Sequence, residues 1–133
     1  MTNRMELIYV DIKEFKKYIY PEYLKLFPSI EIKPYCVIKR AYKKGIQKFI
    51  KIVNNGEFVG FIMTNNLEGA KYLQVDYIGI LSEFQNKSYG TQAIKLLKQR
   101  SRNFVGILIE VETLGFGKNE TENAIREKKE YFL

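Results

Sequence analysis

The segment Gln85-Asn86-Lys87-Ser88-Tyr89-Gly90-Thr91 joins an apolar run, Tyr77 to Leu81, to an amphipathic stretch that begins at Thr91. The sequence therefore predicts a strand, a short polar loop and the start of a helix. The first N–H groups of a helix have no partner within the helix and carry the positive end of its dipole, so such a loop can bind a phosphate. Lys87 adds a full charge, and the small Ser88 and Gly90 let the backbone come close to a ligand.

The chain after this loop predicts a helix, a strand and a second helix. Apolar and small residues recur at helical spacing after Thr91, which places one face of this helix on a sheet. These residues are Ala93, Ile94, Leu97 and Ser101. Ile107 to Val111 then predicts a strand, and Thr121 to about Phe132 predicts a final helix.

The chain before the loop predicts one strand, three short helical pieces and an antiparallel hairpin. Glu6 to Val10 is a strand candidate, and helical pieces follow as far as Gly45, with prolines at 21, 28 and 34 as breaks. Gln47 to Val53 and Glu57 to Thr64 flank the pair Asn55-Gly56, which favours the positive φ angles of a tight hairpin turn. Lys71 to Leu81 is the longest strand candidate. With the three helical pieces counted as two helices, the order is β-α-α-β-β-β-α-β-α.

The composition fits one soluble domain that spans residues 1–133. Hydrophobic residues make up 46% of the chain and charged residues 28%, as in ordinary globular proteins. No apolar run reaches the ~18 residues that cross a bilayer, and the polar start is not a secretory signal. These features predict a cytoplasmic protein without a membrane partner.

The chemistry open to the chain is restricted because it has no histidine and only one cysteine, Cys36. A disulfide within the chain and a cysteine-based metal site are excluded, and we expect no metal cofactor. Proton transfer would have to use carboxylates, tyrosines, lysines or water. The net charge of +7 favours an anionic partner, such as coenzyme A or nucleic acid, although lysine-rich surfaces also serve solubility alone.

The loop of residues 85–91, called the phosphate loop below, and its surroundings resemble the GNAT family, the acetyl-CoA-dependent N-acetyltransferases. Asp76 to Phe84 resembles the fourth strand and the following turn of that family. The family's loop signature is Gln/Arg-x-x-Gly-x-Gly/Ala, and this chain has Gln85, Ser88 and Gly90 at the three positions. The resemblance implies an α/β fold with a mixed, mostly antiparallel central sheet flanked by helices. It also implies a C-terminally shortened chain, because the two strands that normally end the family's sheet do not follow the predicted last helix.

The resemblance further implies how acetyl-CoA binds. The pyrophosphate would lie on the main-chain N–H groups of the phosphate loop. The family's thioester lies beside the fourth strand, here Ile78-Gly79-Ile80, and the Ile80 N–H is the expected donor to the thioester oxygen. Asn123 corresponds to a polar contact with CoA, and Tyr131 to the tyrosine that protonates the departing CoA thiolate. The predicted CoA-binding set is Ile78, Gly79, Ile80, Gln85, Asn86, Lys87, Ser88, Tyr89, Gly90, Thr91 and Asn123.

The predicted catalytic residues are Tyr131 and Asp76, each with a structural alternative. Alternation along a strand places Asp76 on the same face as Ile78 and Ile80, in line with the expected thioester, so Asp76 is the favoured base. Its alternative role is a structural hydrogen bond, and for Tyr131 the alternative is packing. Glu110 and Glu112 are further base candidates, for which a solvent-facing strand position is the favoured interpretation.

The resulting functional prediction is transfer of an acetyl group to a primary amine by direct attack on the thioester, with an unknown acceptor. One alternative is a CoA-binding protein without transferase activity. Another is an RNA-binding module, which is less favoured because aromatic residues at core spacing are normally buried. An unpaired edge on the fifth strand and an apolar end at residues 131–133 predict a homodimer.

Overall fold

The computed structural model describes residues 4–66, 71–102, 104–112 and 128–132, and side chains up to residue 109 within these ranges. Its centre is a six-stranded sheet with the strands in chain order. All neighbouring strands are antiparallel except β4 and β5, which are parallel. This is the mixed, mostly antiparallel sheet that the sequence predicts. The strands are β1 Met5–Val10, β2 Gln47–Asn54, β3 Glu57–Asn65, β4 Tyr72–Ile80, β5 Gly106–Glu112 and β6 Lys128–Phe132.

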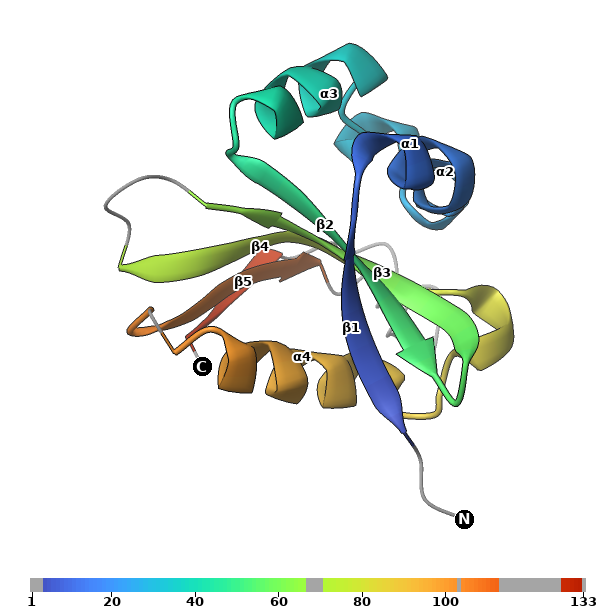
Figure 1. Ribbon diagram of the computed structural model, residues 1–133, viewed down its shortest axis with the longest axis vertical. Helices are drawn as coiled ribbons and strands as arrows, with labels where there is room; N and C mark the ends of the chain where they lie inside the picture. The colour runs from blue at the N-terminus through green and yellow to red at the C-terminus, as the bar shows by residue number, and fades with distance from the viewer. Residues whose placement is uncertain (1–3, 67–70, 103, 113–127, 133) are drawn as a thin grey trace.

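Helices cover both faces of the sheet, as Figure 1 shows: α1, α2 and α3 lie on one face and α4 lies on the other. The helices are α1 Ile12–Glu14, the π-helical turn η1 Phe15–Ile19, α2 Tyr20–Leu26, the 3₁₀ turn η2 Ser29–Glu31, α3 Tyr35–Lys43, the 3₁₀ turn η3 Ser82–Phe84 and α4 Tyr89–Arg100. No helix of the described chain is long and apolar enough to cross a membrane.

Two hydrophobic cores follow from this layering, one on each face of the sheet. Side chains of β2 alternate between them, so Ile50 and Ile52 enter the core under α4 and Phe49 enters the core under α1 to α3. Ala93 and Leu97 of α4 are buried against the sheet, which confirms the helix face predicted from their spacing. The strand β3 is therefore buried on both faces from Val59 to Thr64, and the sheet is a rigid support for loops at its ends.

Three predicted turn signals are confirmed by their backbone angles. Asn55 (φ 52°) and Gly56 (φ 83°) form the β2–β3 turn with the two positive φ angles that it requires. Gly45 (φ 77°) ends α3, where its N–H donates to Tyr42 O at 3.0 Å.

Pro21 does not end the first helical segment, contrary to the expectation of a break or bend there. Proline has no N–H, and its ring displaces the carbonyl one turn earlier. The π-helical turn η1 precedes it, in which the Tyr20 N–H donates to Phe15 O, and α2 then carries Pro21 in its first turn. The wider turn lets the helix continue through the proline.

The prediction of a helix through Phe132 is wrong for residues 128–132, which form β6. This strand pairs antiparallel with β5, from Leu108 opposite Phe132 to Glu112 opposite Lys128. The ladder of main-chain hydrogen bonds to β5 outweighs the weak helical pattern of this short segment. The outer edge of β5 is thus paired within the chain, so the unpaired edge that suggested a homodimer is not present. A homodimer stays a prediction without this reason.

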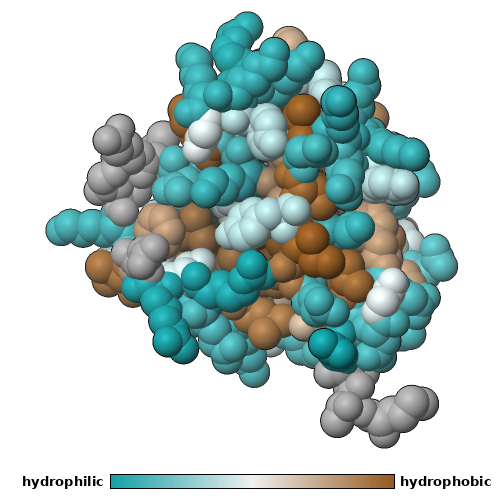
Figure 2. Space-filling view, viewed as in Figure 1, coloured by the Kyte–Doolittle hydropathy of each residue, from teal (hydrophilic) through white to brown (hydrophobic). Residues whose placement is uncertain are grey.

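The other edge of the sheet is β1, which carries the exposed side chains Ile8 (40%) and Tyr9 (51%). Figure 2 shows hydrophobic residues in a band across the middle of the molecule, between hydrophilic regions above and below. The Arg100 guanidinium at the end of α4 donates to Leu7 O, so it occupies an outward carbonyl of this edge. A cationic cap of this kind opposes the addition of a further strand.

Candidate functional site

The sheet opens between β4 and β5. Within the described strands, β4 and β5 pair only from Tyr72 opposite Gly106 to Val75 opposite Ile109. Beyond this point β4 pairs with β3 alone, as far as Ile80, and β5 pairs with β6 alone. Among the described strands, none therefore lies opposite residues 76–80 on this side of β4, so main-chain groups there can pair with an extended ligand.

Hydrogen bonding to β3 shows which groups of β4 point into this opening. The Leu81 N–H donates to Val59 O at 2.9 Å, so Leu81 and Val59 form a hydrogen-bonded pair. Successive residues of a strand turn their backbone groups to opposite sides. The N–H and C=O groups of Ile78 and Ile80 therefore face the opening, which is the position that the sequence predicts for the thioester donor.

The phosphate loop leaves this strand and begins α4. The Gln85 side chain turns back, and its Nε2 donates to Ile80 O at 3.0 Å. Asn86 (φ 67°) and Ser88 (φ 63°) both have left-handed backbone angles, a geometry that turns N–H groups toward a common point. The left-handed conformation costs a serine about 1–2 kcal/mol, and such strain is typical of functional loops.

The first turn of α4 has the unpaired donors that an anion needs. The first helical bond is from Gln92 N to Ser88 O, 3.1 Å, and the Ser88 side chain does not cap the described helix. The N–H groups of Tyr89, Gly90 and Thr91 precede that bond and have no partner within the part of the chain that the structure describes, so they can bind an anion. A Cβ added at Gly90 would meet only Ile80 Cγ1, at 3.8 Å, so the space beside this turn is open. Lys87 is exposed and supplies positive charge nearby.

Gly79 has a packing role rather than an open approach. A Cβ at this position would lie 2.7 Å from Phe61 Cζ and 3.0 Å from Leu26 Cδ1, on the face covered by the first helices. The glycine is therefore required by the ring that lies on it. Its place in the predicted CoA-binding set follows only from its backbone position between Ile78 and Ile80.

Asp76 does not share a face with Ile78 and Ile80, and this prediction is wrong. The β3–β4 register shifts at this point, from Met63 opposite Tyr77 to Thr64 opposite Val75, so Asp76 is the extra residue of a β-bulge. The bulge reverses the alternation: Val75 packs under α4, and Asp76 points toward the side of the first helices. There the carboxylate accepts from Lys33 Nζ at 2.5 Å and from Gln47 Nε2 at 3.4 Å.

Two tyrosines extend this polar cluster beneath the segment that links η2 to α3. Tyr77 donates to Glu31 O, and the Lys33 N–H donates to the Tyr23 hydroxyl at 2.7 Å. The two hydroxyls also hydrogen-bond to each other. Burial raises the pKa of Tyr77 far above its ordinary value, with the hydrogen bond that it shares with Tyr23 as a second cause, and burial also raises the pKa of Tyr23. Both groups are therefore neutral hydrogen-bonding groups at physiological pH.

Sequence reasoning missed Lys33, Tyr23 and Tyr77, because no motif marks them and Tyr77 lies 44 residues from Lys33 and 54 residues from Tyr23. The bulge at Asp76 gives no sequence signal either. Glu110 and Glu112 lie on the part of β5 that pairs with β6, and Tyr131 lies on β6 opposite Ile109. Asn123 lies outside the described residues.

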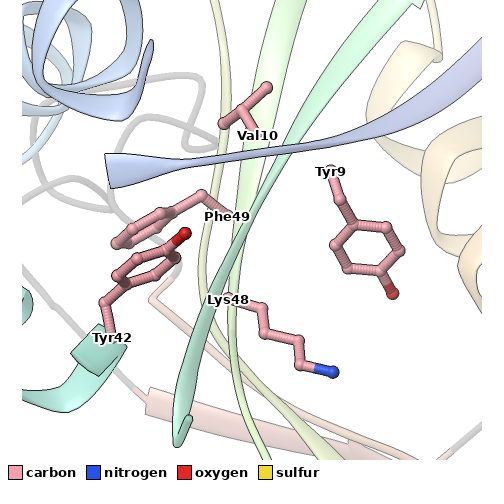
Figure 3. A pocket seen from close by; sticks show the side chains of 5 residues that line it. All are labelled: Tyr9, Val10, Tyr42, Lys48 and Phe49. Carbon is pink, nitrogen blue, oxygen red and sulfur yellow. The ribbon is translucent and has the colours of Figure 1, made fainter. Parts of the chain in front are cut away.

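A separate hollow lies at the opposite edge of the sheet. It has a volume of about 310 Å³ and is lined by Tyr9, Val10, Tyr42, Lys48 and Phe49. Figure 3 shows Tyr42 and Phe49 on one side of β2, and Tyr9 and Lys48 on the other. The hollow forms where β1 ends at Val10 while β2 continues to Gln47. It is distinct from the opening between β4 and β5.

The comparison with protein families agrees with the divergent strands and the phosphate loop. The model of the Acetyltransferase (GNAT) family matches residues 12–126. This chain belongs to the GNAT acetyltransferase family. No curated protein matches it.

Solved structures with the same fold are GNAT acetyltransferases as well. A GNAT family acetyltransferase from Elizabethkingia anophelis with acetyl-CoA bound is similar, with a TM-score of 0.62, 16% identity and coverage of 86% of this chain and 69% of that one. A putative acetyltransferase from Bacteroides thetaiotaomicron has a TM-score of 0.66 at 17% identity, with coverage of 91% of this chain and 65% of that one. The ribosomal-protein-alanine N-acetyltransferase from Brucella melitensis biovar Abortus 2308 has a TM-score of 0.59 at 14% identity, with coverage of 79% of this chain and 78% of that one.

These likenesses show a shared fold. The chain spans about two thirds of the length of the first two structures. The GNAT family assignment fits the observed order of elements, with α4 as the crossover between the parallel strands β4 and β5.

Proposed function

We propose that this protein transfers the acetyl group of acetyl-CoA to a primary amine. The observation that carries this proposal is the unpaired side of β4 next to the phosphate loop. An extended chain with an amide-bearing arm and a pyrophosphate at one end fits a strand-like opening that ends at a helix N-terminus. Acetyl-CoA has this shape, and it supplies an activated acetyl group as a thioester.

The residues of the chain have distinct parts in this scheme. The N–H groups of Tyr89, Gly90 and Thr91 bind the pyrophosphate, and Lys87 attracts it by charge. The Ile80 N–H faces the opening and polarises the carbonyl, because a fixed donor stabilises the negative charge that develops during attack. Positioning contributes most of the rate when the amine arrives unprotonated.

The acceptor side is formed by the polar cluster around Asp76, which lies where β4 and β5 begin to diverge. Its bonds to Lys33 and Gln47 favour the structural one of its two predicted roles, since the carboxylate already holds these two side chains in place. In this proposal Asp76 fixes the segment around Lys33, and water carries the proton away from the amine. The similarity to a ribosomal-protein-alanine N-acetyltransferase supports nitrogen as the acceptor atom.

Tyr131 remains the proposed proton donor to the CoA thiolate, now placed on a strand. Its backbone lies in the row Val75, Ile109, Tyr131, at the level where β4 and β5 separate. Two strand spacings put its backbone roughly 10 Å from β4, with β5 between them. A tyrosine hydroxyl there can return a proton to the leaving group.

The test compares binding and turnover. Thermal melting with acetyl-CoA, free CoA and a short RNA identifies the ligand, because only a ligand of the folded state raises the melting temperature. We expect both forms of CoA to stabilise the protein and RNA to have no effect. A panel of primary amines with thiol release as the signal then separates a transferase from a CoA-binding protein without activity. Stabilisation by RNA alone would refute the proposal.

A further inference from the structure

Asn54 is the last residue of β2, and its side chain is buried although it is polar. Only 4% of the residue is exposed. Its Nδ2 donates to the Tyr89 hydroxyl at 3.2 Å, while its Oδ1 has no hydrogen-bond partner among the residues that the structure describes. If the amide is turned by 180°, the tyrosine hydroxyl donates to Oδ1 and Nδ2 has no partner. Either orientation leaves one half of a buried amide unsatisfied.

A half-satisfied buried amide lowers stability, so its presence calls for a reason beyond packing. An apolar side chain of similar size would fill the same space without this cost. The bond that Asn54 does make reaches Tyr89, which is the first residue of α4. Asn54 therefore connects the β2–β3 hairpin to the helix turn that holds the unpaired N–H groups.

Tyr89 is well placed to hold this turn. Its ring packs against the core under α4 and lies 6.4 Å from the Phe84 ring, between centroids. The ring thus restrains the turn sideways, and the hydroxyl bond to Asn54 fixes its distance from the hairpin. The loop just before it has left-handed residues at 86 and 88 and no side-chain cap on the described helix, so the backbone there has little support of its own.

Two ties hold the phosphate loop to the sheet, one at each end. At its start, Gln85 bonds to Ile80 O, and at its end Tyr89 bonds to Asn54. We propose that Asn54 is a positioning residue for acyl-CoA binding, which fixes the first turn of α4 through the Tyr89 hydroxyl. This inference rests on the proposed function, because it assigns the turn to the CoA phosphates. Asn54 itself does not touch the ligand.

The test uses Tyr89→Phe, Asn54→Ala and the double variant. Tyr89→Phe removes one hydroxyl and keeps the ring in place. Calorimetry with acetyl-CoA should show a Kd about three- to tenfold higher for each single variant, because the N–H groups of the turn are no longer held in the binding geometry. The Kd of the double variant for acetyl-CoA should be no higher than that of the single variant with the higher Kd, since both changes break the same bond. The matched control is Tyr18→Phe, which removes a hydroxyl from an exposed tyrosine and should bind like the parent.

A phosphate-free donor separates positioning from general loss of structure. With S-acetyl-pantetheine as the donor, kcat/KM should be the same for the parent and for Asn54→Ala, whereas with acetyl-CoA the KM of Asn54→Ala should rise and its kcat should stay constant. Equal losses with both donors, or an unchanged Kd for acetyl-CoA, would overturn the inference while the proposed function stands. If the parent itself does not bind acetyl-CoA, the proposed function fails and the inference fails with it.

Discussion

Replacing Gly90 by alanine should change stability and binding in opposite directions. Gly90 is the second residue of α4, its φ is not in the left-handed region, and an added Cβ would meet only Ile80 Cγ1 at 3.8 Å. Alanine is preferred over glycine in helices by about 1 kcal/mol, and less near the ends. We therefore expect Gly90→Ala to raise the free energy of unfolding by about 0.5 kcal/mol, which corresponds to a Tm increase of roughly 2 °C in a chain of this size.

The same methyl group should weaken acetyl-CoA binding. The open space beside Gly90 is where the phosphates approach the N–H groups, so a Cβ lengthens or bends those charge-assisted bonds. A loss of about 1.4 kcal/mol raises Kd about tenfold. At a ligand concentration of about 100 times the parent Kd, the stabilisation by acetyl-CoA should fall from about 2.7 to about 1.4 kcal/mol.

Thermal melts with and without acetyl-CoA, followed by calorimetry, measure both effects on one sample. The control is Gly45→Ala at the end of α3, where φ is 77° and the methyl group meets nothing within 4 Å. Strain there should lower stability by about 1 kcal/mol and leave Kd unchanged. If Gly90→Ala binds acetyl-CoA as tightly as the parent, the phosphates do not lie on this turn and the reasoning is refuted.

Four further changes test other parts of the structure. Tyr131→Phe should lower kcat about 10- to 100-fold and leave the Kd for acetyl-CoA unchanged; equal turnover on a responsive amine would remove Tyr131 from the mechanism. Lys33→Met leaves Asp76 without its cation, so urea unfolding should show a free energy of unfolding that is lower by about 1–2 kcal/mol. Steady-state kinetics should show a higher KM for the amine and an unchanged KM for acetyl-CoA. Ser88→Gly relieves the strain of a serine in the left-handed conformation. It should raise the free energy of unfolding by about 0.5 kcal/mol after the entropy of the unfolded glycine is counted. A lower free energy of unfolding in the same urea experiment would contradict the strain argument. Because burial raises the pKa of Tyr77 and Tyr23, the folded protein keeps protons that the unfolded chain loses near pH 10. The contribution of these two tyrosines to stability should therefore be constant below about pH 9 and fall above pH 10, and the fall should be less steep in Tyr77→Phe.

Local signals in the sequence were sufficient for much of the fold. Asn55-Gly56 specifies a turn with two positive φ angles, Gly45 ends a helix for the same reason, and the spacing of Ala93 and Leu97 marks the face of α4 that meets the sheet. Each of these depends on residues within a few positions of one another. The phosphate loop could be located for the same reason, since a loop that joins a strand to a helix is a local feature.

The remaining errors concern features that depend on distant parts of the chain. The bulge at Asp76 exists because β3 and β4 are out of register by one residue, and alternation within β4 alone cannot show this. Residues 128–132 become a strand because β5 offers them an edge. The cluster of Lys33, Tyr23 and Tyr77 also requires the tertiary fold, since only the folded chain brings the three elements together.

The short contact between β4 and β5 has a consequence for the local stability of the sheet. β1 to β4 form a continuous antiparallel meander, whereas β5 joins it through only four residue pairs, from Tyr72–Gly106 to Val75–Ile109. Opening this ladder breaks few hydrogen bonds and leaves the meander intact, so it should need less free energy than global unfolding. The amide protons of β5 should then exchange with deuterated solvent faster than those of β2 and β3, and bound acetyl-CoA should slow their exchange by bridging the two halves of the sheet.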